Sequence, residues 1–590
     1  MTNNTIQNEF FKSKVLGHPA GLFVLFFTEM WERFSFYGMR VLLVNFLTMA
    51  IVGVDNPGWG WSTENAGALF GTYAGLLYLT PIAGGIIADK LVGYRWAVVI
   101  GAFIMTLGHA CMALDSELSL YLGLGLLVLG TGLFKPNITS IISEMYKFLP
   151  EKKDGAYTIF YMGVNAGAFF GMMLCGYLAE RIGWSWGFGL AGIFMLLGTL
   201  QFWLAKPLFG DIGEVPKEDK SDQIPEGEEE GVYKPNRFTL LDKILIGITS
   251  IIGLTYLIDD PLSKIANIHI LPQNSPITLS GTPLSGSLAV VLIGLLLFLF
   301  LVIMRISRYT KVVRDRMIAV IIFAFFTVFF WLSFEQGASS LIIFARDYVD
   351  RTLEGGAALT FNVVNTLLTV IPLIIISWVL WLLARQSFKK IPGSNIVLII
   401  CFTCIWVLVL WMLYREFYAE TTEITVSWFS ILNSFFIIAF ASFFSKWWDS
   451  KYNPSAALKY SFGLILLGIG FGLLAFGSQG MIAGAKVSMV WLILAYLFHT
   501  LGELCLSPVG LSYVSKLVPA RMIAFMFGMW YLAVAIGQKV AGTLGGKITA
   551  ITEQYDISTF FLIFTAIPIV AGIVVALLNP LLKKLMHNVR

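Results

Sequence analysis

The chain contains 590 residues, of which 57% are hydrophobic and only 13% are charged, and its formal net charge is +4. A soluble globular protein is nearer half apolar and a quarter charged, so this composition excludes that class and predicts an all-α polytopic protein of the lipid bilayer. The small net charge gives no sign of a nucleic-acid partner, and we expect none.

About sixteen stretches are apolar enough, and close enough to 20 residues in length, to cross a bilayer. They cover roughly residues 21–48, 65–88, 96–114, 118–142, 157–179, 187–206, 240–258, 286–304, 317–343, 358–384, 394–414, 426–447, 460–478, 488–514, 519–543 and 557–582. An even number places both termini on one side. The loops of that side are rich in lysine and arginine, as in RISRYTKVVRDR at 305–316, so the positive-inside rule predicts cytoplasmic termini.

The only long polar segment covers residues 207–239 and follows the sixth span. Its glutamate, lysine, proline and glycine content is typical of a flexible linker. The six spans before it and the second group after it predict two helical bundles. Transporters built of two such halves hold their substrate between them, near the membrane midplane.

Glu29, Glu32, Arg33 and Arg40 lie inside the first apolar stretch, in EMWERFSFYGMR. At 100° per residue these four side chains share one arc of a helix. A charge in hydrocarbon costs about 2.5–3.5 kcal/mol even on lenient insertion scales, so the four must face a protein interior or an aqueous cavity and find partners there. The pattern therefore predicts an ion or proton pathway.

Three further ionisable side chains interrupt later spans: Lys135 in GTGLFKPNITS, Glu335 in FFWLSFEQGASS and Glu503 in HTLGELCLSPVGLS. Basic groups in one half that face acidic groups in the other could clasp both ends of a zwitterion through charge-assisted hydrogen bonds. A buried carboxylate that takes up a proton would break such an ion pair. This is the chemistry that a proton-driven carrier requires.

The remaining polar residues of the spans give weaker indications. Asn165 and Asn433 could each bind a substrate or bridge two helices. We interpret His499, one turn before Glu503, as structural rather than as a proton relay. No metal-ligand cluster, phosphate-binding glycine loop or nucleophile–base pair occurs at a plausible spacing, so the sequence predicts neither an enzyme nor a bound cofactor or metal.

Together these segments resemble the proton-dependent oligopeptide transporters (POT or PTR) of the major facilitator superfamily. The family's first-helix motif, E-x-x-E-R-F-x-Y-Y, is matched by EMWERFSFY at 29–37, with phenylalanine in place of the first tyrosine. GGIIADKLVGYRWAVV at 84–99 is similar to the family's loop between helices 2 and 3, and YTIFYMGVNAGAF at 157–169 is similar to its helix 5 signature. The lysine and both glutamate segments look like family segments too, so the resemblance extends from about residue 20 to residue 580.

The resemblance implies a proton-coupled symporter that imports di- and tripeptides by alternating access across a bacterial inner membrane. Its proton-coupling residues would be Glu29, Glu32, Arg33, Lys135 and Glu335. Its substrate-binding residues would be Arg40, Tyr37, Tyr78, Lys135, Asn165, Trp331, Asn433, Glu503, Ser507 and Trp530. Arg40 and Lys135 would hold the peptide carboxylate, and Asn165, Asn433 and Glu503 would hold the amino end. Arg40 and Glu335 would form a gate salt bridge on the extracellular side.

The family organisation implies an N-terminal six-helix bundle at 15–206, a cytoplasmic linker with an inserted hairpin at 207–316, and a C-terminal six-helix bundle at 317–590. Family members pass almost directly from helix 7 to helix 8, whereas this chain has an apolar pair of spans there. We therefore predict a second inserted hairpin at about 356–416, packed at the periphery. The expected partners are a di- or tripeptide and protons, and we expect a monomer.

Two other functions fit parts of the pattern. A related carrier of nitrate or another small anion would share the fold, but Glu503 and the full E-x-x-E-R motif suit a peptide amine and proton coupling. A transport-dead peptide sensor would keep the site and signal through its loops. The 207–239 linker is short and featureless for a signalling domain.

Overall fold

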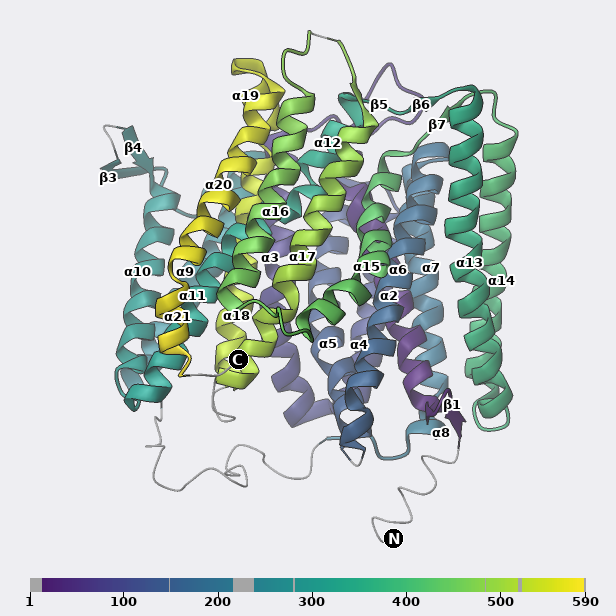
Figure 1. Cartoon of the computed structure of the whole chain (residues 1–590), viewed down its shortest axis with the longest axis horizontal. Helices are drawn as coiled ribbons and strands as arrows, with labels where there is room; N and C mark the ends of the chain where they lie inside the picture. The colour runs from purple at the N-terminus through teal and green to yellow at the C-terminus, as the bar shows by residue number, and fades with distance from the viewer. Residues whose placement is uncertain are drawn as a thin grey trace.

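The computed structural model describes residues 13–147, 149–215, 238–279, 282–482, 484–517 and 523–587. Within these ranges, 14 helices are long and apolar enough to cross a membrane. Two further helices have a comparable length, α2 (Ala20–Thr48), which carries the four predicted charges, and α18 (Ile523–Gly545). Each of the sixteen expected spans therefore corresponds to a helix, and the all-helical membrane architecture is confirmed (Figure 1).

The first bundle is formed by α2 and the five long helices that follow it. These are α3 (Thr63–Ile87), α4 (Tyr94–Met112), α5 (Glu117–Met145), α6 (Lys153–Arg181) and α7 (Trp184–Leu204), with the short helices η1 (Ala88–Val92), η2 (Pro150–Lys152) and α8 (Lys206–Phe209) between or after them. Glycine allows α6 to lie directly against α2. A Cβ at Gly167 would come within 2.9 Å of the Cβ of Arg33, so only glycine permits this approach. The charged face of α2 is thereby fixed by backbone packing.

The second bundle contains six long helices, one of which is α18. The others are α11 (Lys311–Phe334), α15 (Val426–Trp448), α16 (Ala456–Gly477), α17 (Met489–Leu517) and α20 (Ile557–Leu577). Short helices complete it: η4 (Glu335–Ala338), α12 (Ser340–Asp347), α19 (Ile548–Gln554) and α21 (Asn579–Leu585). Glu335 is the first residue after α11, where the helix tightens into a single 3₁₀ turn.

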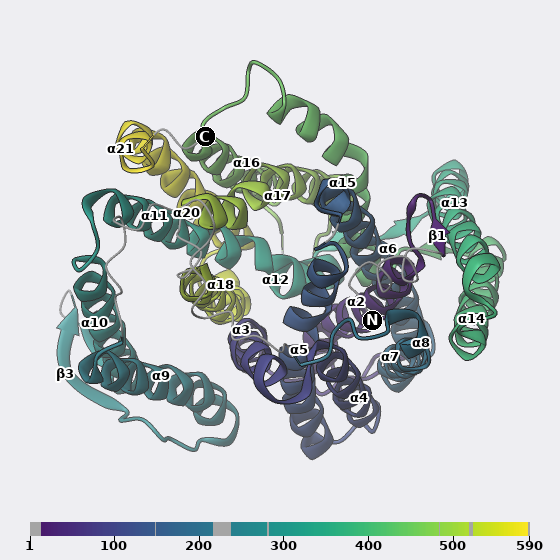
Figure 2. The same cartoon turned by 90° about the horizontal axis from the view of Figure 1, so that it is seen from below.

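A hairpin of two membrane-length helices lies beside α3, outside both bundles (Figure 2). It consists of α9 (Leu240–Pro261) with η3 (Leu262–Ala266), the strands β3 (Asn274–Leu279) and β4 (Thr282–Ser285), and α10 (Gly286–Ile306). Buried Asp242 of α9 binds Arg305 at 2.9 Å and Arg308 at 2.8 Å. These ion pairs join the two ends of the hairpin.

A second hairpin, α13 (Gly355–Ser387) and α14 (Pro392–Phe417), lies at the opposite edge of the molecule (Figure 2). It follows the second bundle's α12 in sequence, yet α14 packs on α7 of the first bundle. Phe402 of α14 makes edge contacts with Trp31 and Phe27 of α2, at ring-centroid distances of 5.6 and 5.5 Å. The hairpin therefore covers the back of the helix that carries the predicted charges.

Short strands cap the ends of the helices. The strand pairs are β1 (Lys14–Val15) with β2 (His18–Pro19), β5 (Val349–Asp350) with β8 (Val487–Ser488), and β6 (Thr352–Leu353) with β7 (Thr422–Glu423). We call the face that holds β1 and α21 the terminal face, and the face that holds α19 and β5–β7 the distal face (Figure 1). The β6–β7 pair joins the two ends of the α13–α14 hairpin at the distal face.

The two bundles meet closely at the distal face. The carboxylate of Glu180, at the end of α6, accepts hydrogen bonds from the backbone N–H groups of Val426 and Ser427, at 2.8 and 3.0 Å. A negative charge at these positions satisfies otherwise unpaired donors at the N-terminus of α15. A further contact joins α3 to α18, where a Cβ at Gly67 would lie 2.3 Å from the backbone oxygen of Gly542.

Candidate functional site

The charged face of α2 is buried, as its sequence predicts. Glu29, Glu32 and Arg33 are 5%, 0% and 5% exposed. The Arg33 Nε lies 2.9 Å from a carboxylate oxygen of Glu29 and 2.5 Å from one of Glu32. The Glu32 carboxylate is balanced by the positive charges of Arg33 and Lys135. One guanidinium is thus paired with two carboxylates, and a proton on either carboxylate would change the net charge of the cluster.

Lys135 of α5 faces the same cluster. It is repelled by Arg33 and attracted by Glu32 and Glu29, and its ammonium lies 4.6 Å from the ring centroid of Tyr78 on α3. The ring face offers a cation a favourable partner that carries no formal charge. Lys135 is therefore held between an acidic cluster and an aromatic surface.

The aromatic surface extends across both bundles. The ring of Tyr78 lies 6.5 Å from Trp331 on α11 and 6.4 Å from Tyr531 on α18. Tyr37 of α2 is half-buried, with the Arg40 guanidinium 5.7 Å from its ring. These rings can pack against apolar side chains of varied size and require no specific hydrogen bond from them.

Arg40 joins the first bundle to the second. Its guanidinium forms an ion pair with Glu335, which is 1% exposed. It also lies 5.8 Å from the ring centroid of Phe36, the position at which the sequence departs from the POT motif. The same Phe36 ring lies 5.3 Å from the Arg33 guanidinium, so this ring lies between Arg40 and the acidic cluster.

The second bundle supplies an amide next to a carboxylate. Asn433 of α15 donates from Nδ2 to the Glu503 carboxylate on α17 at 2.9 Å, and the same nitrogen lies 3.1 Å from the Thr500 hydroxyl. Glu503 also interacts electrostatically with Arg40 across the bundle interface. A carboxylate with this orientation can accept hydrogen bonds from an ammonium group.

Three predicted residues stand apart from these contacts. The Asn165 amide donates to the backbone oxygen of Tyr161 within α6, at 3.0 Å. Ser507 is exposed on α17, one turn after Glu503. Trp530 is 5% exposed and packs so closely on α17 that a Cβ at Gly510 would lie 2.5 Å from its ring. His499 is buried against Phe471, with ring centroids 4.3 Å apart, as expected of a structural residue.

The structure adds residues that the sequence did not single out. Thr500 shares the amide of Asn433, and Tyr531 contacts Tyr78 from the second bundle. Tyr161 is half exposed on α6 and interacts electrostatically with Tyr37 and Glu503. Helical spacing could have indicated Thr500 and Tyr161, since they lie about one turn before Glu503 and Asn165. Among the described residues no group of side chains has the arrangement of a metal site.

Comparisons with known proteins point to one family. The profile of the POT family matches residues 95–222 and 395–563. The peptide transporter YePEPT of Yersinia enterocolitica is 30% identical over 97% of this chain and 96% of its own length, and a di-/tripeptide transporter of Lactococcus lactis is 27% identical over 97% and 98%. A crystal structure of a mutant peptide transporter POT in complex with alafosfalin superimposes with a TM-score of 0.70 at 26% identity, covering all of both chains. The buried charges of α2, the two bundles and these matches agree, and the chain is a member of the POT family of transporters.

Proposed function

We propose that this protein is a symporter that couples the import of di- and tripeptides to an inward flow of protons, by alternating access between its two bundles. The observation that carries the proposal is the opposition of Arg40 in the first bundle to Glu503 and Asn433 in the second. A short peptide is a zwitterion whose ends need one cationic and one anionic partner. The relatives named above as peptide transporters support this assignment.

In this proposal the peptide carboxylate binds Arg40 and Lys135, and the peptide ammonium binds Glu503, Asn433 and Asn165. Tyr37, Tyr78 and Trp331, with Ser507 and Trp530 on the second bundle, would line the side-chain pocket. The backbone of a peptide is common to all sequences, whereas the aromatic rings tolerate many side chains. Such a site would accept many di- and tripeptides.

Proton coupling would use the α2 cluster and the gate pair. With Glu29 and Glu32 both ionised, Arg33 is held between them; a proton on Glu32 would leave Arg33 paired with Glu29 alone and change the field at Lys135. A proton on Glu335 would remove its attraction to Arg40, which is then free for the peptide carboxylate. In both steps the arginine keeps an anionic partner, Glu29 for Arg33 and the peptide carboxylate for Arg40, so neither step leaves a buried cation unpaired.

We also propose an orientation and an assembly state. The terminal face would be cytoplasmic and the distal face extracellular in a bacterial inner membrane, because basic residues such as Lys389 and Lys390 follow α13 at the terminal face. The bundles would comprise residues 15–206 and 317–590, joined by 207–316, and the protein would act as a monomer. Since Arg40 and Glu335 are paired, the state described here would be the one closed to the outside.

The test is uptake of radiolabelled dialanine by proteoliposomes with and without an imposed inward proton gradient. Accumulation above equilibrium only with the gradient supports the proposal. Nitrate uptake without dialanine uptake would identify an anion carrier instead. Dialanine binding without any uptake, in a preparation that elutes as a single folded species, would identify a sensor.

A further inference from the structure

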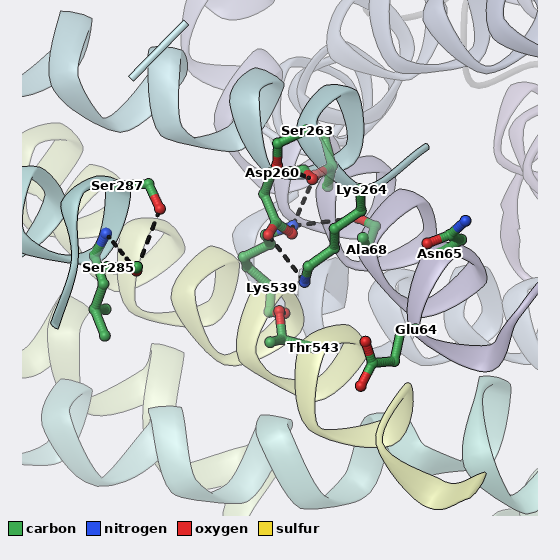
Figure 3. A network of polar contacts seen from close by, with 12 residues as sticks. Glu64, Asn65, Ala68, Asp260, Ser263, Lys264, Ser285, Ser287, Lys539 and Thr543 are labelled. Atoms are coloured by element: carbon green, nitrogen blue, oxygen red, sulfur yellow. Dashed lines mark hydrogen bonds and ion pairs between the residues drawn. The ribbon is translucent and has the colours of Figure 1, made fainter. Parts of the chain in front are cut away.

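Lys539 of α18 contacts two other parts of the protein, α3 of the first bundle and α9 of the inserted hairpin (Figure 3). Its side chain is 6% exposed, and its ammonium donates to the backbone oxygen of Ala68 at 3.2 Å and to the hydroxyl of Thr72 at 2.9 Å, both on α3. The same ammonium forms an ion pair with Asp260 at the end of α9. One lysine of the second bundle therefore binds the first bundle and the inserted α9–α10 hairpin at once.

The hairpin is itself attached to the first bundle at this point. The Thr72 hydroxyl donates to the backbone oxygen of Leu257, one turn before Asp260, at 2.8 Å. Lys264 pairs with the other oxygen of Asp260 at 3.0 Å from within the hairpin. The carboxylate of Asp259 accepts hydrogen bonds from the backbone N–H groups of Ile270 and Leu271, which fixes the chain that follows η3. Asp260 is thus presented to the seam between α3 and α18 rather than to solvent.

The seam is tight because glycine lines it from both sides. A Cβ at Gly71 would lie 2.8 Å from the backbone oxygen of Lys539, and a Cβ at Gly542 would lie 2.5 Å from the Cα of Gly71. The helices can approach so closely only when both positions are glycine. Any opening of the protein at the distal face must separate α3 from α18 here, and so must remove Lys539 from Ala68 and Thr72.

A buried ammonium is stable only while its partners remain. In the closed seam Lys539 has an anion and two neutral acceptors, whereas separation of the helices removes the two acceptors on α3. The hairpin is bound to α3 by Thr72 and to α18 by Lys539, so it spans the seam that has to open. Separation therefore costs either the contact of α9 with α3 or the ion pair with α18.

We propose that Lys539 and Asp260 form a second cross-bundle latch, in which the inserted α9–α10 hairpin acts as a strap that stabilises the conformation closed at the distal face. The latch rests on the alternating access of the proposed function. It differs from the Arg40–Glu335 pair in that it touches neither cargo nor the predicted proton-coupling residues. Its role is to set how often the distal face opens.

The test measures the distance between spin labels on Asp55→Cys in the first bundle and Gln554→Cys in the second, by double electron–electron resonance. Both positions are exposed at the distal face, and the five native cysteines are replaced by alanine. We expect Lys539→Met and Asp260→Asn each to increase the long-distance population at least twofold. The double variant should show a long-distance population no larger than that of either single variant. Lys539→Arg, which keeps the charge, should retain the parent distribution.

Lys264→Met is the matched control, because Lys264 binds the same carboxylate from within the hairpin. Unchanged distances in Lys539→Met and Asp260→Asn would overturn the latch, as would additive effects in the double variant. If Lys539→Met does not fold, Asp260→Asn alone decides. The distance measurement needs no peptide. A failure of dialanine uptake would therefore count against the proposed function but would not affect the test of the latch.

Discussion

Arg40 on α2 and Glu335 at the first position of η4 form an ion pair that joins the two bundles near the distal face. Arg40 also interacts with Glu503, so it is placed between two carboxylates of the second bundle. In the proposed mechanism, a peptide carboxylate bound to Arg40 would compete with this ion pair, which would otherwise hold the distal face closed. This relationship gives the first prediction.

Glu335→Gln should reduce gradient-driven dialanine accumulation at least tenfold while leaving exchange of internal for external peptide measurable. The reason is that a neutral side chain cannot release Arg40 on protonation, and a charge-assisted contact is worth about 1.5–3 kcal/mol, or roughly ten- to a hundredfold. Paired assays of accumulation and exchange in proteoliposomes make the comparison. Glu553→Gln, an exposed change on α19, is the control. Accumulation equal to the parent's would contradict the gate role.

Glu32→Gln should also abolish accumulation, but for a different reason. Glu32 is fully buried beside Arg33, and the glutamine cannot carry a proton through the cycle. We expect exchange within threefold of the parent and no response of uptake to an imposed gradient. Glu553→Gln, an exposed change on α19, again serves as the control. A retained gradient response in Glu32→Gln would show that another group carries the proton.

Glu503→Gln should weaken binding of peptides with a free amino terminus by about ten- to a hundredfold, since it removes the anionic partner of the ammonium. N-acetylated dialanine, which has no ammonium, should bind the variant and the parent alike. Isothermal titration calorimetry or competition uptake with the two ligands measures the difference. Equal losses for both ligands would mean that Glu503 supports the fold of the site and does not contact the amino end.

Phe402→Ala should destabilise the protein by about 3–5 kcal/mol, the usual cost of removing a buried aromatic ring. Phe402 is 4% exposed and fills the space between α14 and the Trp31 and Phe27 rings. Ile400→Ala, at a 47% exposed position of the same helix, should have little effect. Thermal unfolding in detergent compares the two. Similar stabilities would show that the α13–α14 hairpin contributes little to the first bundle.

The β1–β2 turn should lose protection as the pH falls. Burial and the nearby Lys152 hold the pKa of His18 below its ordinary value of 6.5, and its Nδ1 lies 2.6 Å from the Tyr146 hydroxyl. A neutral imidazole accepts that hydroxyl's hydrogen bond, whereas a protonated one cannot. Because the pKa of His18 is lower in the folded state, the detached segment binds more protons than the folded one as the pH falls through 6.5. The stability of the turn is therefore complete above pH 6.5 and decreases below it.

Hydrogen–deuterium exchange of residues 14–20, corrected for the intrinsic effect of pH, measures this loss. Between pH 7.5 and 5.5 we expect the protection factor to fall about fivefold, as for a hydrogen bond worth about 1 kcal/mol. His18→Asn, which cannot titrate, should show no such fall. A pH response of the same size in that variant would exclude His18 as its origin.

The charged face of α2 could be predicted from sequence because a helix has a fixed angular period and charges in an apolar helix need an interior. Glu29, Glu32 and Arg33 lie together for that reason. The pairing of Arg40 with Glu335 could not be deduced in this way. The two residues are far apart along the chain, and only resemblance to the POT family suggested their contact.

Other features depend on docking, about which a sequence pattern says little. The span predicted to end near residue 258 continues as a helix to Pro261, which carries Asp260 toward Lys539, 279 positions later. The apolar composition predicted that α13 and α14 exist. An apolar side chain on these helices can face lipid or pack on α7, and the sequence pattern does not distinguish the two. The contact of Phe402 with Trp31 thus required the three-dimensional structure.

In the proposed mechanism peptide and proton move together, so we would first measure proton flux driven by peptide. Proteoliposomes with a pH-sensitive dye inside, and with the membrane potential clamped at zero by potassium and valinomycin, receive dialanine outside. We expect acidification of the lumen that depends on dialanine and is absent in Glu32→Gln. Dialanine entry at the parent rate without lumenal acidification would contradict it.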